Sequence, residues 1–351
     1  MSESITNTFP RLAGKIPRLP LAELPTPIDA HTVRLGGKAH AIAIKRDDLT
    51  GKLYGGNKVR KLEYLVHKAA RKNARCIATF GTVASNHALA TALYAHQLGY
   101  ESMCFLSHQT RTPSAARALG IHLHNDTKII RYGGGRQNRI ATLRENLQQP
   151  GVFLIPPGGS NWLGAMGFVN AGLELAAQVA AGDVDEPGRL YVANGTMATA
   201  VGIALGLALS GSDTEVHAVQ VTENFVSSPD AMRRLLAKTA FVMHQLDEAV
   251  PADLASRARY QFRSGFLGDG YARTNAATDS AIATARDHLG LELEATYTGK
   301  AMAALLDDLV ALPSTGSVMF WNTYNSRSLP AAAEAPARND KLPDDFRRYF
   351  G

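Results

Sequence analysis

The chain has 351 residues, of which 45% are hydrophobic and 19% are charged. This balance is typical of a soluble globular protein and excludes an intrinsically disordered one, and the length suits two domains. The 37 basic and 31 acidic residues leave a net charge of +6, which suits an anionic small ligand. The basic residues are scattered rather than clustered with aromatic ones, so we expect no nucleic-acid partner.

Two cysteines, Cys76 and Cys104, lie in apolar stretches. We expect both to be reduced core residues of a cytoplasmic protein. Residues 1–14 contain no sustained apolar run, so we expect no signal peptide. No stretch approaches the length of a membrane span. No cluster of histidine, cysteine or carboxylate side chains has metal-ligand spacing, and the prediction is therefore no metal.

In chain order, residues 1–36 are polar and interrupted by prolines, and we expect a segment that wraps around the surface. Strands and helices then alternate. The strands expected in this half are 39–44, 75–80, 100–106, 128–131 and 152–155. The helices expected between them are 58–73, 86–98, 113–119 and 136–148. Strands interleaved with helices predict parallel sheets that are covered on both faces.

Residues 156–161, Pro-Pro-Gly-Gly-Ser-Asn, are rigid and then flexible, and indicate a crossing between domains. Beyond them the helices expected are 162–181, 199–209 and 300–312, and residues 229–290 are expected to be mainly helical. The strands expected are 190–193, 215–221 and 317–321. The segment after Leu329 is rich in alanine, proline and charge, which indicates a surface tail.

Polar residues gather in four loops that follow strands, 45–58, 81–87, 194–199 and 322–327, and in residues 297–300 before a helix. In open α/β sheets, ligands bind at the carboxyl ends of the strands. These loops are therefore the places where a functional site is expected.

Lys58 follows Gly55-Gly56-Asn57 and begins an apolar-periodic run. The spacing predicts a loop-to-helix corner, where glycines would let a ligand approach the backbone. A lysine held partly out of water has a lowered pKa and becomes an amine nucleophile. A helix-starting turn with solvated lysines is the alternative.

Two further loops lead from a strand into a helix. Ser85-Asn86-His87 offers a hydroxyl and amides that suit a carboxylate or phosphate, although a simple helix cap with a packed histidine is the more common arrangement. Residues 194–199, Asn-Gly-Thr-Met-Ala-Thr, are suited to hold a phosphate at a helix N-terminus, with a tight turn as the alternative.

Two other motifs carry less functional signal. The triple glycine Gly133-Gly134-Gly135 indicates only a loop into a helix. Asp47-Asp48 beside Lys45-Arg46 indicates a structural cluster of ion pairs rather than an acid–base pair.

Several motifs in one order resemble the D-cysteine desulfhydrase and 1-aminocyclopropane-1-carboxylate deaminase family. The resemblance extends from about Leu24 to Trp321. The motifs that carry it are Lys45-Arg46-Asp47-Asp48-Leu49-Thr50, Gly55-Gly56-Asn57-Lys58-x-Arg60-Lys61-Leu62-Glu63, Ser85-Asn86-His87, Pro156-Pro157-Gly158-Gly159-Ser160-Asn161 and Tyr297-Thr298-Gly299-Lys300-Ala301-Met302. The resemblance implies an α/β, two-domain, parallel-sheet, tryptophan-synthase-β-like fold with pyridoxal 5′-phosphate as cofactor.

The resemblance also implies roles for single residues. Lys58 would form the Schiff base with the cofactor, and Asn86 would hydrogen-bond its ring hydroxyl. Ser85 would meet the substrate as an auxiliary acid, base or nucleophile, with Asn86 and His87 beside it. The phosphate would be held by Asn194, Gly195, Thr196, Met197, Ala198 and Thr199. Thr298 would face the pyridine nitrogen, and Tyr271 and Tyr297 would flank the substrate, with Tyr271 placed only by its spacing to Tyr297.

Thr298 favours the desulfhydrase branch, because the deaminase branch carries a glutamate there. A neutral hydroxyl would not keep the pyridine nitrogen protonated, and this favours prompt β-elimination. The chain departs from the family at Met197-Ala198, at residues 322–327 and at Glu294-Ala295-Thr296. Within 322–327, Arg327 or Asn325 would favour a substrate with an extra anionic group, such as cysteate.

The resemblance therefore implies a pyridoxal-phosphate-dependent carbon–sulfur lyase that converts a small amino acid to a 2-oxo acid and ammonia. The alternatives are 1-aminocyclopropane-1-carboxylate deamination, racemisation, a lyase for an anionic substrate, and an amino-acid-binding protein with a decayed site. The expected large domain is 1–59 plus 169–351, and the small domain is 60–168. We expect a homodimer and no membrane partner.

Overall fold

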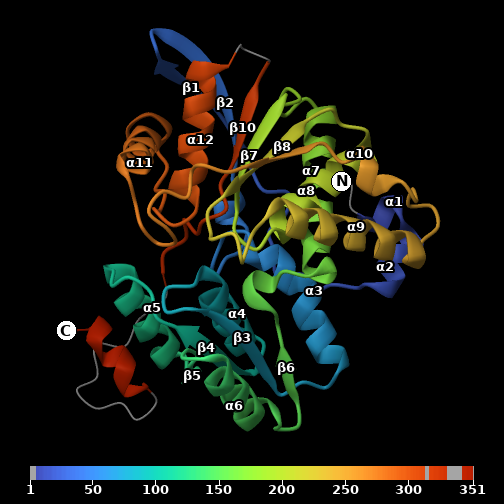
Figure 1. Cartoon of the computed structure of the whole chain (residues 1–351). Helices are drawn as coiled ribbons and strands as arrows, with labels where there is room; N and C mark the ends of the chain where they lie inside the picture. Colours follow the sequence, from blue (N-terminus) through green and yellow to red (C-terminus); the bar gives the residue numbers. More distant parts are fainter. Residues whose placement is uncertain (1–4, 313–315, 330–341, 351) are drawn as a thin grey trace. The chain divides into compact units, whose positions relative to one another are not determined.

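The computed structural model describes residues 5–312, 316–329 and 342–350, and its chain forms two compact units (Figure 1). The larger unit comprises Met1–Tyr64 and Ser160–Ser326, and the smaller unit comprises Leu65–Gly159 and Arg327–Gly351. The sequence-based division places 327–351 in the large domain, whereas this segment groups with the smaller unit.

The larger unit is built on a six-stranded sheet with the order β1-β2-β10-β7-β8-β9. The strands are β1 (Ile28–Leu35), β2 (Lys38–Lys45), β7 (Arg189–Asn194), β8 (Glu215–Gln220), β9 (Tyr260–Arg263) and β10 (Val318–Trp321). Only the β1–β2 pair is antiparallel. Its two-residue turn is Gly36-Gly37, and both glycines have positive φ, as a tight hairpin requires.

Two strands of this sheet were not expected from the sequence. β1 lies in the proline-rich stretch, and β9 lies within the stretch 229–290 that was expected to be helical. Both are edge strands with few buried side chains, so neither shows the continuous apolar run that identifies a central strand. The remaining strands confirm the expectation of parallel sheets in an α/β fold.

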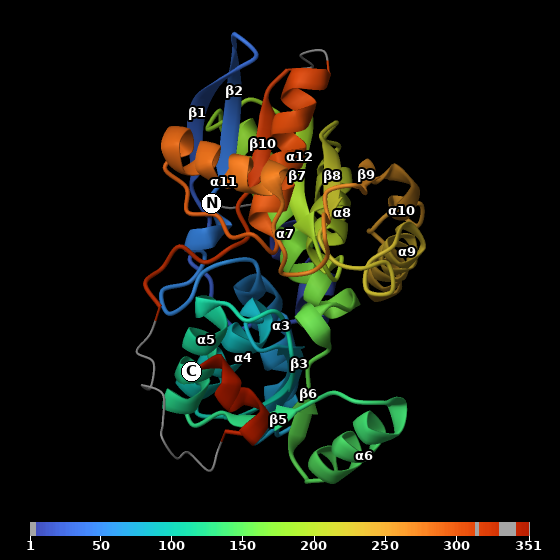
Figure 2. The same ribbon diagram turned by 60° about the vertical axis from the view of Figure 1, so that its left-hand side comes forward.

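Helices cover both faces of this sheet. On one face, α11 (Ala276–Leu289) and α12 (Thr298–Ala311) share a hydrophobic core with Tyr191 and Phe320. On the other, Trp321 packs edge-on against Phe168 of α7 (Trp162–Ala180), because successive strand residues point to opposite faces. Figure 2 shows α7 and α8 (Ala198–Ser210) beside the strands.

The length of α7 corrects the expectation that no stretch approaches the length of a membrane span. By length and composition it qualifies as a membrane-spanning helix, but most of it is buried inside the unit, as in the core helix of a globular domain. Its backbone lies directly against α8: a Cβ added at Gly172 would come within 2.9 Å of the Gly206 Cα, and one at Gly206 within 2.3 Å of the Val169 carbonyl oxygen. The small residues of both helices therefore permit this contact.

Besides the start of α3, the larger unit contains five further helical segments in the part of the chain that the structure describes. They are α1 (Ile5–Thr8), α2 (Pro10–Lys15), the 3-10 helix η1 (Asp47–Leu49), α9 (Pro229–Leu246) and α10 (Leu254–Arg257). The N-terminal segment wraps onto the unit as expected, since Leu12 is buried and its N–H donates to Asp247 of the segment after α9 (3.3 Å). α3 (Lys58–Arg71) begins in this unit and continues into the residues of the smaller one.

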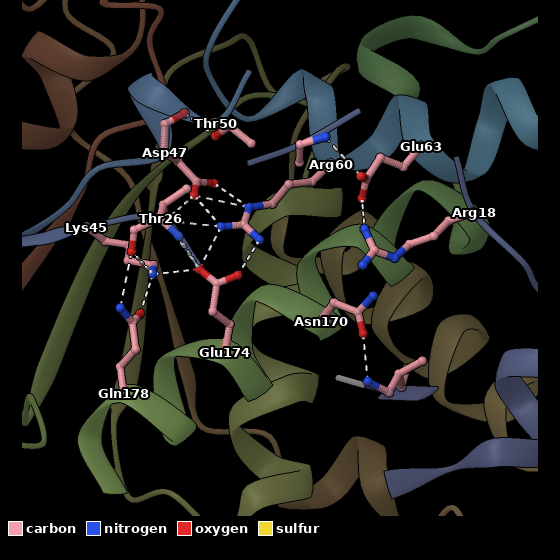
Figure 3. A network of polar contacts seen from close by, with 12 residues as sticks. Arg18, Thr26, Lys45, Asp47, Thr50, Arg60, Glu63, Asn170, Glu174 and Gln178 are labelled. Atoms are coloured by element: carbon pink, nitrogen blue, oxygen red, sulfur yellow. Dashed lines mark hydrogen bonds and ion pairs between the residues drawn. The ribbon is translucent and has the colours of Figure 1, made fainter. Parts of the chain in front are cut away.

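A network of buried charges holds the start of α3 against β2 and α7 (Figure 3). Glu174 accepts hydrogen bonds from Lys45 Nζ (2.7 Å) and Arg60 Nη1 (2.9 Å), and Arg60 Nη2 also donates to Asp47 (2.7 Å). All four residues are at most 2% exposed. The expected ion-pair cluster around residues 45–48 is thereby confirmed, but its main partners, Arg60 and Glu174, come from distant helices.

The smaller unit contains a four-stranded, fully parallel sheet with the order β5-β4-β3-β6. Its strands are β3 (Cys76–Thr82), β4 (Glu101–Ser107), β5 (Lys128–Arg131) and β6 (Val152–Leu154). Its helices are α4 (Asn86–Gln97), α5 (Pro113–His124), α6 (Arg136–Leu147), η2 (Pro157–Gly159) and η3 (Asp344–Tyr349). Cys76 and Cys104 are free and buried here.

The expectation that the residues after Leu329 form a surface tail is wrong for η3, which packs into the core of the smaller unit. Residues 330–341 of that tail lie outside the described residues, but Phe346 and Tyr349 are buried in one core with Leu106 and Leu119. The Tyr349 hydroxyl accepts the Gln109 N–H (3.0 Å) and donates to the Gln109 carbonyl (3.0 Å). The sequence signal for this packing was the pair Phe346 and Tyr349, two aromatic residues within a charged segment.

Candidate active site

Lys58 is the first residue of α3, as the sequence predicts, but the two glycines before it serve the chain itself. A Cβ at Gly55 would lie 1.9 Å from the Asp48 carbonyl oxygen, and one at Gly56, where φ is +87°, would lie 2.8 Å from that of Thr323. Glycine is required because three backbone segments meet here. The expectation that these glycines make room for a ligand is therefore corrected.

The Lys58 amine is held in an environment that favours its neutral form. Its Nζ donates to Asn57 Oδ1 (2.6 Å) and lies 5.9 Å from the centre of the Tyr297 ring. Burial lowers the pKa of Lys58 to about 8, while the negative charge of Glu294 acts in the opposite direction. At a pKa of about 8, roughly one amine in ten is neutral at pH 7, compared with fewer than about one in a thousand for an unperturbed lysine.

Asn57 links this lysine to the loop between β7 and α8. Its Nδ2 donates to Thr199 Oγ1 (3.0 Å), so one side chain contacts both Lys58 and the first turn of α8. No role for Asn57 was predicted from the sequence. Its position next to Lys58 in the motif was the only available signal.

The loop Asn194–Thr199 leads from β7 into the first turn of α8. Met197 caps α8 in a left-handed conformation (φ 72°) and makes no side-chain cap hydrogen bond. A non-glycine residue in this region costs about 1–2 kcal/mol. Ser160 Oγ braces the loop by accepting the Ala198 N–H (3.0 Å) and donating to the Thr196 carbonyl. The N-terminus of α8, which carries the positive end of the helix dipole, therefore has no anionic side chain as its cap. This arrangement suits a phosphate.

Asn194 differs from the rest of that loop. It is 1% exposed, and its Nδ2 donates to Ser227 Oγ (3.3 Å) on the segment that leads to α9. Among the described residues its Oδ1 has no hydrogen-bond partner. The side chain therefore orders the neighbouring segment beneath the loop.

Tyr271 and Tyr297 are brought together by the fold. Their hydroxyls are hydrogen-bonded, and their rings meet edge to face with centroids 5.7 Å apart. Burial, and then the neighbouring Tyr271, raises the pKa of Tyr297 well above its usual value, so this phenol is neutral. The spacing argument thus places Tyr271 beside Tyr297, although the role of the pair stays a prediction.

Two side chains missed by sequence reasoning hold the loop that carries Tyr271. The buried Lys300 donates to the carbonyls of Leu267 (2.7 Å) and Gly270 (2.8 Å). Glu223 Oε1 accepts the N–H of Tyr271 (3.1 Å). Lys300 lies within the motif that follows Tyr297, and that was the signal that a functional or supporting role belonged to it.

Thr298 is fully buried at the start of α12, and its partner is Glu294. Glu294 accepts three backbone N–H groups, from Thr296 (2.7 Å), Tyr297 (2.8 Å) and Thr298 (2.8 Å). It is the acidic residue whose charge acts on Lys58. Glu294 was identified in the sequence only as a departure from the family pattern.

The loop after β10 is tied to the glycine corner. Asn325 Oδ1 accepts the Gly55 N–H (2.6 Å), and the Ser326 N–H donates to the Asp48 carbonyl (3.2 Å). The sequence suggested Asn325 as a contact for an anionic substrate. Its amide oxygen satisfies the backbone of the segment before Lys58, and its role toward a substrate stays a prediction.

The remaining predicted residues belong to the smaller unit. Ser85 caps α4 by accepting the Ala88 N–H (3.2 Å), and Asn86 is the first residue of that helix. His87 is 3% exposed, and its Nε2 shares a hydrogen bond with Thr79 Oγ1 (2.9 Å). Ser85 is thus a helix cap and His87 a packed histidine, while their roles toward a substrate stay predictions.

Two further predictions from the sequence concern the triple-glycine segment and a metal site. The triple-glycine segment is a loop that leads into α6, with Gly135 as an N-cap that has no side-chain hydrogen bond. Within residues 5–312, 316–329 and 342–350, no group of three or more histidine, cysteine or carboxylate side chains is arranged to hold a metal ion.

Comparisons with known proteins show the family to which the chain is similar. A family model described as pyridoxal-phosphate dependent enzyme matches residues 19–323. A D-cysteine desulfhydrase of Yersinia pestis (strain Pestoides F) is 33% identical over 335 residues, which cover 92% of this chain and 98% of the relative. A D-cysteine desulfhydrase of Salmonella choleraesuis is 32% identical, with coverages of 90% and 96%. A solved structure described as an ACC deaminase homologue superposes with a TM-score of 0.72 at 25% identity, over 92% of this chain and 95% of that one.

Proposed function

Because the chain belongs to the family of pyridoxal-phosphate dependent enzymes, we propose that it is a carbon–sulfur lyase of the D-cysteine desulfhydrase type. Its substrate would be a small amino acid with a leaving group on Cβ, and its products a 2-oxo acid, ammonia and the released thiol. The observation that carries the proposal is Lys58, a lysine at a helix start whose pKa burial lowers to about 8. The two D-cysteine desulfhydrases similar over nearly the whole chain support this choice of reaction.

The residues present fit the cofactor. The first turn of α8 offers backbone N–H groups without an anionic cap, and this is the donor set that a phosphate needs. Lys58 offers an amine that is partly neutral at physiological pH. We assign the phosphate to residues 194–199, covalent attachment to Lys58, the ring nitrogen to Thr298 and the ring hydroxyl to Asn86.

When bound, the cofactor supplies an electron sink for the bond that breaks at Cα of the substrate. Lys58 then serves as the base that removes the Cα proton, since its pKa near 8 lets the amine accept and return a proton at neutral pH. Asn57 orients that amine through its 2.6 Å hydrogen bond. Its second hydrogen bond, to Thr199, keeps the lysine in register with the phosphate loop.

The tyrosine pair is assigned to the leaving group. Tyr297 is neutral because burial and Tyr271 raise its pKa. The two hydroxyls are hydrogen-bonded to each other, and a neutral phenol is an acid that can protonate a departing thiolate. Ser85 is assigned to the substrate as an auxiliary acid or base, and Asn86 and His87 to substrate binding.

A second candidate function is deamination of 1-aminocyclopropane-1-carboxylate. The similarity to the ACC deaminase homologue favours it, since the two folds agree over more than nine-tenths of each chain. Thr298 argues for the desulfhydrase, because the deaminase branch is expected to carry a glutamate at that position.

The test presents D-cysteine, L-cysteine, cysteate and 1-aminocyclopropane-1-carboxylate in parallel. Sulfide, 2-oxo acid and ammonia are measured for each compound. We expect equal amounts of sulfide, ammonia and pyruvate from D-cysteine. Ammonia and 2-oxobutyrate from the cyclopropane substrate alone would refute the desulfhydrase and establish the second candidate.

Attachment of the cofactor is tested separately from turnover. Borohydride reduction followed by peptide mass analysis should place the cofactor on Lys58, and Lys58→Ala should lose the label. Lys52→Ala is the matched control, because that side chain is 83% exposed and pairs with Glu23. Labelling at another lysine in the wild-type enzyme would refute the assignment.

We further propose a cytoplasmic homodimer, on the basis of the family resemblance and the reduced state expected for Cys76 and Cys104. Light scattering of the purified enzyme and fractionation of the source cell test the two statements.

A further inference from the structure

The hydroxyl of Thr298 has its proton and one of its lone pairs committed to a single residue. Its Oγ1 accepts the Glu294 N–H (3.1 Å) and donates to Glu294 Oε1 (3.2 Å). A threonine hydroxyl has one proton and two lone pairs. Within the described ranges the only acceptor recorded for this proton is the Glu294 carboxylate. One lone pair therefore remains for any ligand that meets Thr298.

This leaves Thr298 able to accept a hydrogen bond from a ligand but not to donate one. An unprotonated pyridine nitrogen is itself only an acceptor, and two acceptors facing each other repel. A pyridine nitrogen that carries a proton is a cationic donor, which matches the free lone pair. The charge that balances this cation lies one hydrogen bond behind the hydroxyl, on Glu294.

The residues around Thr298 keep its hydroxyl in the orientation that accepts, but does not donate, a hydrogen bond toward a ligand. Thr298 is fully buried, so bulk water does not replace the Glu294 contact. The Thr296, Tyr297 and Thr298 N–H groups all donate to the Glu294 carboxylate and fix its position beside the Thr298 hydroxyl. The cations whose charges act on Glu294 are Lys58 of α3 and Lys300 of α12, and the latter is occupied by two carbonyls.

We propose that Glu294, acting through Thr298, keeps the ring nitrogen of the bound cofactor protonated. This inference rests on the proposed function, because it assumes that Thr298 meets the ring nitrogen. Glu294 is then a positioning residue: it fixes the direction of the Thr298 hydroxyl and supplies the compensating charge. The expectation that a threonine here leaves the nitrogen neutral is replaced, since the hydroxyl and carboxylate together do what a direct carboxylate does.

A purely structural role for Glu294 is the competing explanation. Its carboxylate caps α12, and loss of that cap alone would destabilise the helix. A cap does not, however, change the protonation of a ligand atom. The decisive readout is therefore the ring nitrogen itself rather than stability or turnover.

The experiment loads the apoenzyme with cofactor labelled with 15N in the ring and records the nitrogen chemical shift without substrate. We expect a protonated nitrogen in the wild-type enzyme. In Glu294→Gln the ratio of protonated to neutral nitrogen should fall by about tenfold or more, which corresponds to at least one pKa unit. A neutral nitrogen in the wild-type enzyme, or an unchanged shift in Glu294→Gln, overturns the proposal.

Two substitutions at Thr298 keep the test decisive if Glu294→Gln does not fold. Thr298→Val removes the hydroxyl but leaves Glu294 and its three backbone contacts, and should also yield a neutral nitrogen. Thr298→Ser should restore protonation. A protonated nitrogen in Thr298→Val overturns the proposal by itself.

The matched control is Glu223→Gln. Glu223 also accepts a backbone N–H in this unit, that of Tyr271, but makes no hydrogen bond with Thr298. Its substitution should leave the shift unchanged. A wild-type enzyme that takes up no cofactor contradicts the proposed function, whereas a loaded enzyme with a neutral nitrogen contradicts this inference alone.

Discussion

Replacing Glu174 by Gln tests how the buried charges at the start of α3 contribute to stability. Lys45, Asp47, Arg60 and Glu174 carry two positive and two negative charges, all buried. Removing the charge of Glu174 leaves a net charge of +1 without water. Breaking a buried pair by removing one partner costs about 3–5 kcal/mol.

The pKa of Glu174 gives an independent estimate of this magnitude. Burial by itself raises that pKa, but the charges of Arg60 and Lys45 and their hydrogen bonds lower it from 4.5 to about 2. The difference corresponds to about 3 kcal/mol of stability at pH 7, in agreement with the mutational range. Because the folded pKa is the lower one, this contribution is present above pH 4.5 and is lost as the pH falls toward 2.

The assay is urea unfolding of the wild-type and Glu174→Gln enzymes at one fixed cofactor concentration, since a bound cofactor adds its own stabilisation. We expect a gap of about 3 kcal/mol at pH 7 that shrinks to less than about half at pH 3. Asp230→Asn is the matched control: its partner Arg233 is 67% exposed, and the expected loss is below about 0.5 kcal/mol. A gap below about 1 kcal/mol at pH 7, or one that stays constant down to pH 3, refutes the reasoning.

Three further predictions follow from the site. Gly55→Ala places a Cβ 1.9 Å from a backbone oxygen and should lower the melting temperature by an amount equivalent to about 2 kcal/mol or more. The control is Gly133→Ala, where the added Cβ meets nothing within 4 Å, and it should have little effect. Equal melting temperatures for the two variants would contradict the close packing at Gly55. Lys300→Met leaves two loop carbonyls without their donor and should speed hydrogen exchange in residues 267–273, with a loss of about 1–3 kcal/mol; unchanged exchange would show that the loop is held by other contacts. The rate at which apoenzyme captures the cofactor should rise through pH 8, because the pKa of Lys58 is lowered to about 8 and only the neutral amine reacts; a rise centred above pH 10 would refute the lowered pKa.

The alternation of apolar strands with helices predicted the two parallel sheets, because buried strands must be apolar along their whole length. The same rule explains the misses. β1 and β9 are edge strands with mixed side chains, and their pairing partners are set by β2 and β8 rather than by their own pattern. η3 was missed because its two buried aromatic residues are separated by charged ones.

The residues of the candidate site also divide into those that could be predicted from the sequence and those that could not. Lys58 and Thr298 were predictable because each begins a helix within a recognisable motif. The glycine corner was misinterpreted because a sequence does not reveal which atoms approach a glycine, and here they belong to the chain itself. Glu294 and Lys300 were assigned no role because their partners are backbone groups, which leave no complementary residue in the sequence.

The packing of η3 also bears on how the polypeptide folds as it is synthesised. The core of the smaller unit is completed by Phe346 and Tyr349, which are translated after every residue of the larger unit. Domains generally fold as units, with N-terminal ones first during synthesis. In this chain the core of the unit that contains Ser85 cannot be completed until Phe346 and Tyr349 have been translated, and until then the apolar side chains of Leu106 and Leu119 lack these two partners.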